Sequence, residues 1–165
     1  MRHRLATYVL FFAVIGLHLV ILLGAFIAPY SPAAQNRDLA YAPPTHIHFL
    51  DTSEFHWRPF VYGQINGLNG YGDDLTHQYR LRIFVKGDSY RVLGMFRTKL
   101  HLFGVDAPGQ VFLLGTDAYG RDELSRLLYG GQISLAAGLM ATFITLATAT
   151  IIGTISGAWR RRMPR

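Results

Sequence analysis

Residues 115–159 decide the architecture of this chain, and they read GTDAYGRDELSRLLYGGQISLAAGLMATFITLATATIIGTISGAW. The first third carries charges of both signs, whereas no charged residue occurs from Ile133 to Trp159. A helix rises about 1.5 Å per residue, so the uncharged run is roughly 40 Å long and exceeds the ~30 Å hydrocarbon thickness of a bilayer. We therefore expect a transmembrane helix over residues 132–159.

A second apolar run lies near the N-terminus, Tyr8 to Ala28, and reads YVLFFAVIGLHLVILLGAFIA. As a helix it rises about 31 Å, which also suffices to span a bilayer, and Pro29 and Pro32 are expected to end it. A signal peptide has an apolar core of only about 7–15 residues followed by a small-residue cleavage site, so we interpret the run as an uncleaved anchor. The single ionisable residue in it, His18, is interpreted as a packing contact rather than a proton path.

The composition supports a membrane protein. Of 165 residues, 50% are hydrophobic and 16% charged, and the apolar residues concentrate in the two runs. The net charge of +6 falls largely outside these runs, which fits membrane topology better than a nucleic-acid partner. The absence of cysteine excludes disulfides, thiolate metal sites and a cysteine nucleophile.

The basic residues also predict orientation. Arg2 and Arg4 precede the first run, while Arg160–Arg162 and Arg165 follow the second. Positive residues collect on the cytoplasmic side, and two spans return the chain to the side on which it began. We expect a multi-pass protein of the cytoplasmic (inner) membrane, with cytoplasmic termini at residues 1–7 and 160–165 and spans at residues 8–28 and 132–159.

The segment between the spans is expected to lie outside the cytoplasm as a mostly-β insertion, residues 29–114. Its first part, Ser31 to about His77, is rich in turn-forming residues and is predicted to be mostly loop. From Tyr79 onward strand-forming residues predominate, with a hairpin turn expected at Lys86–Ser89 and a third strand at Thr98–Val105. The predicted fold class is an α-helical membrane protein with two transmembrane helices and a small antiparallel sheet.

Several histidines and acidic residues in this insertion are of the types found in metal-binding and catalytic sites. The histidines His46, His48, His56, His77 and His101 match no compact metal-ligand spacing, and we interpret them as surface residues. The acids Asp51 with Glu54, and Asp73 with Asp74, lie among turn formers that they are expected to cap. Neither a catalytic motif nor a phosphate-binding loop occurs in its required context, so no catalytic residue, metal or cofactor is predicted.

Residues 115–131 lead into the second span. Thr116 or Asp117 is expected to bind free backbone N–H groups in a turn. A short interfacial helix is predicted from Asp122 to Tyr129, with Leu124, Leu127 and Leu128 on one face, a Glu123–Arg126 pair, and Gly130-Gly131 as its stop.

The second span has small and hydroxylated residues along its length. Gly153 and Gly157 have the spacing of a close helix–helix contact, so this helix is expected to pack against partners. Its threonines can bond to carbonyls of their own helix and need not line a pathway.

Residues 115–139 resemble the GTDxxGRDxxSRxxYGxRxSLxxG segment of permease subunits in the peptide/nickel group of ABC importers, the type related to dipeptide and oligopeptide permease C. Gln132 departs from the arginine often found there. The basic start, the first span and the Ala-Pro-Tyr-Ser-Pro exit resemble the same family. The motif positions, interpreted as structural, are Gly115, Thr116, Asp117, Gly120, Arg121, Asp122, Ser125, Arg126, Tyr129 and Gly130.

The resemblance implies a membrane component of an ATP-driven importer of di- or oligopeptides. It also implies a second permease subunit, cytoplasmic ATPase subunits and an extracytoplasmic peptide-binding protein as partners. The permease would not itself be an enzyme, because ATP hydrolysis resides on the ATPases. The substrate-binding residues are not identified by the sequence.

Family members have about six spans and a cytoplasmic coupling loop, so the sequence suggests a truncated or split subunit. One alternative is a two-span sensor or scaffold whose outer domain binds a ligand or protein. Another is a membrane-anchored metal-binding or hydrolytic domain, which requires the histidines or acids to converge in space.

Overall fold

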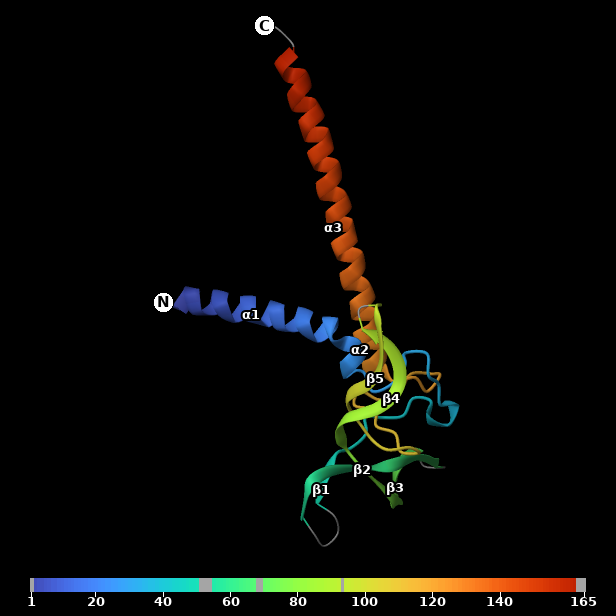
Figure 1. Cartoon of the computed structure of the whole chain (residues 1–165). Coiled ribbons are helices and arrows are strands. Elements are labelled where there is room, and N and C mark those ends of the chain that lie inside the picture. Colours follow the sequence, from blue (N-terminus) through green and yellow to red (C-terminus); the bar gives the residue numbers. More distant parts are fainter. Residues whose placement is uncertain (1, 51–54, 68–69, 93, 163–165) are drawn as a thin grey trace. The chain divides into compact units, whose positions relative to one another are not determined.

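A computed structural model describes residues 2–50, 55–67, 70–92 and 94–162 (Figure 1). The chain divides into two compact units, Met1–Gly131 and Gln132–Arg165. The first contains all the strands and the N-terminal helix, and the second is the continuation of the C-terminal helix. Among the described residues, two helices are long and apolar enough to cross a membrane, with candidate spans at Arg4–Leu22 and Glu123–Trp159.

The first apolar run forms two helices rather than one. Helix α1 covers Arg2–Leu22, and the four-residue helix α2 covers Gly24–Ile27. The prediction of a single helix over residues 8–28 is therefore wrong at its C-terminal end. Leu23, at ψ 7°, separates the two helices, and the following glycine favours the helix less than other residues do.

The second apolar run belongs to one continuous helix, α3, which covers Glu123–Arg162. The prediction that Gly130-Gly131 ends a short helix is wrong. A glycine inside a helix costs only about 1 kcal/mol, and a stop needs the left-handed backbone that the structure does not assign to either glycine. Residues 115–131 are thus a turn followed by the first turns of a long helix.

Strands occupy much of the region that the sequence predicted to be loop. Strands β1 (His48–Leu50), β2 (Phe55–Gly67) and β3 (Gly70–Arg80) form an antiparallel sheet in the order β1-β2-β3. The prediction of loop from Ser31 to His77 is wrong over these residues. Gly67 pairs with Gly70 where β2 ends and β3 begins. The Asn-Gly pairs therefore mark the connection of a β-hairpin rather than an extended loop.

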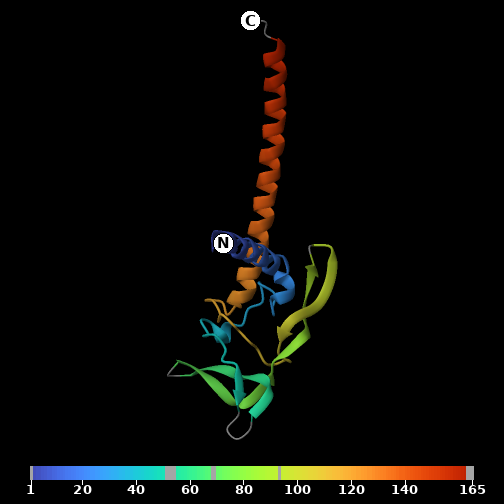
Figure 2. The ribbon, with the colours of Figure 1, turned by 90° about the vertical axis from the view of Figure 1, so that its left-hand side faces the viewer.

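A separate two-stranded hairpin follows, made of β4 (Arg82–Val92) and β5 (Phe96–Gly104) (Figure 2). The strand predicted at Thr98–Val105 is confirmed, but the turn predicted at Lys86–Ser89 is wrong. Those residues lie within β4, where the pairing register shifts between Lys86 and Tyr90. The turn comes later, at Gly94, whose φ is +76°.

The core of the first unit is small. Buried Leu39, Ala42 and Phe112 form one cluster, against which Tyr30 and Tyr71 pack. Leu39 belongs to the 3-10 helix η1 (Arg37–Leu39). We therefore infer that hydrogen bonds, more than apolar burial, hold the loops between α2 and α3 in place.

In the second unit, the threonines bond to their own helix, as the sequence predicted. Thr142, Thr145 and Thr148 each donate to the carbonyl oxygen four residues earlier, at 2.8–2.9 Å. Apart from the backbone of α3 itself, no atom of the described residues lies within 4 Å of a Cβ built on Gly153 or Gly157. The packing role of these two glycines stays a prediction.

Candidate functional site

The segment before α3, residues 115–122, folds back on itself as a tight loop that we call the motif loop. Thr116 and Asp122 form an antiparallel bridge, and the Asp117 N–H donates to the Arg121 carbonyl at 3.0 Å. Gly120 turns the chain at φ +68°, a backbone conformation that glycine adopts without steric cost. The motif residues of the loop are thereby brought together at the start of a helix.

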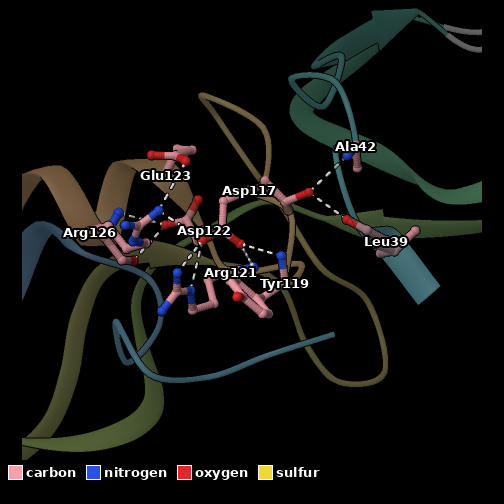
Figure 3. A network of polar contacts seen from close by, with 10 residues as sticks. Leu39, Ala42, Asp117, Tyr119, Arg121, Asp122, Glu123 and Arg126 are labelled. Atoms are coloured by element: carbon pink, nitrogen blue, oxygen red, sulfur yellow. Dashed lines mark hydrogen bonds and ion pairs between the residues drawn. The ribbon is translucent and has the colours of Figure 1, made fainter. Parts of the chain in front are cut away.

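Asp117 is the centre of this loop (Figure 3). Its Oδ1 accepts hydrogen bonds from the backbone N–H groups of Tyr119 at 2.8 Å and Arg121 at 3.0 Å. Its Oδ2 accepts from the Arg121 guanidinium, with Nη2 at 2.6 Å, and from Arg126 Nη1 at 2.8 Å. The same Arg126 nitrogen reaches Glu123 Oε1 at 3.2 Å, which confirms the predicted Glu123–Arg126 pair.

The protonation of Asp117 follows from these contacts. Burial opposes ionisation of this carboxyl, but hydrogen bonds from Arg121 and Tyr119 outweigh it and lower the pKa of Asp117 to about 2. Asp117 is therefore a permanent anion at neutral pH, with its lone pairs already engaged. Such a carboxylate holds a structure together and is a poor general base.

Thr116 joins the motif loop to residues 39–45. Its hydroxyl donates to the Leu39 carbonyl at 2.5 Å and accepts the Ala42 N–H at 2.8 Å, and its own N–H donates to the Ala42 carbonyl. The expectation that Thr116 and Asp117 satisfy free backbone groups is confirmed for both. A Cβ on Gly115 would lie 2.5 Å from the Ala42 carbonyl oxygen, so the backbones approach too closely for a side chain at this position.

Gly120 joins the motif loop to a second segment, around Asn36. The Asn36 N–H donates to the Gly120 carbonyl at 3.2 Å, and a Cβ on Gly120 would collide with the Asn36 carbonyl oxygen. Asn36 in turn donates from Nδ2 to Gln110 Oε1 at 2.7 Å. Gly120 therefore allows both the turn of the motif loop and the close approach of the Asn36 backbone.

Asp122 caps the start of α3. Its Oδ2 accepts the Ser125 N–H at 2.8 Å and the Ser125 hydroxyl at 2.5 Å, as an N-cap side chain does. Burial raises the pKa of Asp122 above its ordinary value, and within the described residues Oδ1 has no hydrogen-bond partner. Asp122 also lines a cavity of about 40 Å³, which suits water rather than a peptide.

Ser125 and Tyr30 extend the network to the exit of α2. The Tyr30 N–H donates to Ser125 Oγ at 3.3 Å across 95 positions of sequence, and the Tyr30 hydroxyl accepts the Val111 N–H at 2.8 Å. Burial raises the pKa of Tyr30 to about 12. The sequence marked Tyr30 only as part of a proline-rich helix exit, although an aromatic residue between two prolines was a usable signal.

The first turns of α3 differ from the predicted interfacial helix. Leu124, Leu127 and Leu128 lie on one face of α3, as predicted, but that face is not uniformly buried: Leu128 is buried, whereas Leu127 is 65% exposed. Gly130 has open space around it, and a Cβ on Gly131 would lie 3.3 Å from Ile21.

The histidines of the insertion fall into two environments. His46 and His48 each lie 3.7 Å from Asp73, and His77 lies 3.1 Å from Asp74, all near the surface. His101 is buried, with Nδ1 2.5 Å from the Ala28 carbonyl oxygen and Nε2 2.9 Å from that of Asp88. In the described part of the chain, no three acidic or histidine side chains are placed to hold a metal ion. The side chain of His56, and Asp51 with Glu54, lie outside the described residues.

Comparison with known proteins confirms a partial similarity to permease subunits of peptide ABC transporters. A peptide transport system permease protein of Brucella suis is 47% identical over 55 residues, 33% of this chain and 18% of that relative. In Haemophilus influenzae, the dipeptide transport system permease protein is 50% identical over 46 residues (28% and 16%), and the oligopeptide one is 54% identical over 43 residues (26% and 14%). These matches span less than a fifth of each relative. Neither a family model nor a solved structure matches the chain.

Proposed function

We propose that this chain is a non-enzymatic membrane component of an ATP-driven importer of di- or oligopeptides. The observation that carries the proposal is the similarity to dipeptide and oligopeptide transport system permease proteins, together with two helices long enough to span a bilayer. The dense hydrogen bonding of the motif loop supports a structural role for the motif, because Asp117, Arg121 and Arg126 are engaged with one another rather than directed at a ligand.

In the proposed arrangement, α1 and α3 cross the inner membrane and both termini are cytoplasmic. Residues between the two helices lie outside, where a peptide-binding protein would dock. The exposed apolar side chains along α3, among them Phe143, Ile144 and Ile151, face lipid or the helices of a second permease subunit. Gly153 and Gly157 would allow one such helix to approach closely.

The motif loop would set the start of α3 against the exit of α2. It bonds to residues 36–45 through Thr116 and Gly120, and to Tyr30 through Ser125. A chain whose helix begins at a fixed point presents the same face to a partner in every copy. We propose that this is the contribution of the motif to assembly of the importer.

Co-purification tests the proposal. The tagged chain is expressed with the ATPase subunits and the second permease subunit of the same locus, and the membranes are solubilised in mild detergent. We expect all partners to elute together, and Asp117→Asn to lower their recovery while Asp106→Asn leaves it unchanged. Recovery of the wild-type chain from the membrane without any partner would contradict an importer component and favour the two-span sensor or scaffold.

A further inference from the structure

The three-stranded sheet and the β4–β5 hairpin meet at Leu81, the single residue between β3 and β4. The Leu81 N–H donates to the Pro59 carbonyl of β2 at 2.9 Å, which ties the junction to the sheet. On the hairpin side, Ile83 of β4 lies directly opposite Phe103 of β5, so their side chains share one face. Backbone pairing therefore fixes the junction on both sides.

A pocket of about 500 Å³ lies at this junction, entirely within the first unit of the chain, and we call it the junction pocket. It is lined by Arg58, Pro59, Leu81, Arg82, Ile83 and Phe103. Small-molecule sites in proteins have volumes of about 300–1,000 Å³, whereas a protein partner covers a broad surface of roughly 800 Å². The size of the junction pocket therefore favours a small ligand.

The charged side chains that line the junction pocket, among the residues that the structure describes, are two arginines. Arg58 is exposed and forms no ion pair with any described residue. Arg82 binds Asp106 through Nη1 alone, which lies 3.1 Å from Oδ1 and 2.9 Å from Oδ2. Its other N–H groups have no acceptor in the described part of the chain. Guanidinium groups with unused donors suit a carboxylate, which they can bind in a bidentate manner.

The rest of the lining is apolar. Pro59, Leu81, Ile83 and Phe103 have no polar side-chain atoms, and Ile83 is 71% exposed. A ligand with an apolar group would remove part of this surface from water, and such burial stabilises a complex. The lining therefore favours a ligand that combines a carboxylate with an apolar group.

We propose that the junction pocket binds the carboxyl end of a short peptide. Arg58 and Arg82 bind the terminal carboxylate, and the last side chain of the peptide packs against Ile83 and Phe103. No acidic residue is among the described residues that line the pocket, so the ammonium end of the peptide finds no partner there. The inference deepens the proposed function, on which the choice of a peptide over other apolar acids rests.

Calorimetric titration of the full chain in detergent micelles tests the inference on the wild type. The dipeptide alanyl-phenylalanine is compared with its C-terminal amide, which lacks the negative charge, and with alanyl-glycine, which lacks the apolar side chain. We expect the amide to bind about tenfold more weakly and alanyl-glycine several-fold more weakly. Absence of binding, or equal affinity for the dipeptide and its amide, would overturn the inference.

The ammonium end is tested with the N-acetylated dipeptide. Acetylation removes the positive charge but leaves the carboxylate, so we expect the affinity to stay the same. Loss of binding on acetylation would mean that the ammonium end is the one recognised, and would overturn the assignment of the carboxyl end.

Substitution of the two arginines tests the location of the site. Arg58→Gln with Arg82→Gln should lower the affinity for alanyl-phenylalanine about tenfold and abolish its preference over the amide. Arg91→Gln with Arg97→Gln is the matched control, because these exposed arginines pair across the hairpin and do not line the pocket. Urea unfolding midpoints check that both double variants remain folded. An equal loss of affinity in the two double variants would indicate non-specific charge attraction and overturn the inference.

Two further measurements separate the ligand class from the proposed function. Phenylpropanoate has the same ring and carboxylate but fills less of the pocket, so it should bind more weakly than the dipeptide. Tighter binding of phenylpropanoate would overturn the assignment of a peptide. If the dipeptide does not bind while the importer subunits still co-purify, the inference fails and the proposed function stands. Dipeptide binding by a chain that recruits no subunit would support the pocket and contradict the importer.

Discussion

Asp117 in the motif loop and Asp73 in the three-stranded sheet each face two basic side chains, yet they differ in almost every other respect. The Asp117 side chain is 10% exposed and lies 2.6–2.8 Å from Arg121 and Arg126, and it also accepts two backbone N–H groups. The Asp73 side chain is 27% exposed and lies 3.7 Å from both His46 and His48. Short bonds that include the backbone distinguish a structural centre from a loose surface cluster.

The largest effect expected from this comparison is that of Asp117→Asn. The substitution removes the charge that holds two guanidinium groups, and breaking such a pair on one side costs about 3 kcal/mol. Asp106→Asn is the control, because the Arg82–Asp106 pair is exposed on both sides and should contribute less than about 1 kcal/mol. Urea unfolding of the full chain in detergent micelles measures both. Equal losses for the two variants would contradict the distinction.

The histidines give the next largest difference. His101→Ala should destabilise the chain by about 2–3 kcal/mol, because it empties a buried site beside Tyr90 and removes the imidazole hydrogen bond to a backbone carbonyl oxygen. His46→Ala should change stability by less than about 0.5 kcal/mol, since its side chain is 75% exposed. The same unfolding assay compares them. A larger loss at His46 would mean that the surface cluster is the more important of the two.

Two glycines of the motif should respond in opposite directions. Gly120→Ala places a Cβ against the Asn36 carbonyl at a positive φ and should cost about 1–3 kcal/mol. Gly130→Ala meets open space inside α3 and should stabilise the chain by up to about 1 kcal/mol. Destabilisation by both substitutions to the same degree, measured as unfolding midpoints, would show that Gly130 has a contact of its own in the folded protein.

The smallest predicted effect is a pH dependence of the motif loop. The folded pKa of Asp117 is about 2, below its ordinary value of 3.8, so its stabilisation is complete above about pH 4 and is lost as the pH falls towards 2. The stability difference between the wild type and Asp117→Asn should therefore shrink over this window. Asp74, whose pKa is lowered by Thr76, and Asp122, whose pKa is raised by burial, titrate in both chains and cancel in the difference. A difference that stays constant down to pH 2.5 would contradict the assigned role of Asp117.

The predictable parts of the structure were those with a local cause. Composition alone gave the two apolar helices, and the spacing of Glu123 and Arg126 gave their pair. Turn chemistry gave the role of Asp117, which accepts the Tyr119 N–H. Each of these depends on residues only a few positions apart.

The parts that could not be predicted depend on distant partners or on competing local signals. The turn-forming Asn-Gly pairs led to a prediction of loop where β2 and β3 occur. The Lys86–Ser89 interval, predicted to be a turn, is instead a shift in the pairing register of β4. The bonds of Ser125 to Tyr30 and of Thr116 to Ala42 cross 95 and 74 positions of sequence. Contacts between residues so far apart leave no repeating pattern in the sequence. The motif could therefore be recognised, but the segments that it contacts could not be predicted.

Hydrogen exchange of the full chain in detergent tests the central claim most directly, namely that the Asp117 side chain holds the motif loop in the shape in which Thr116 and Gly120 bind the segments around it. In Asp117→Asn, we expect faster exchange of amides in residues 115–126 and also in residues 36–45 and 110–112, with β1–β3 unchanged. Asp106→Asn should leave all of these segments as in the wild type. Faster exchange confined to residues 117–121 in Asp117→Asn would contradict the claim, because the loop would then order only itself.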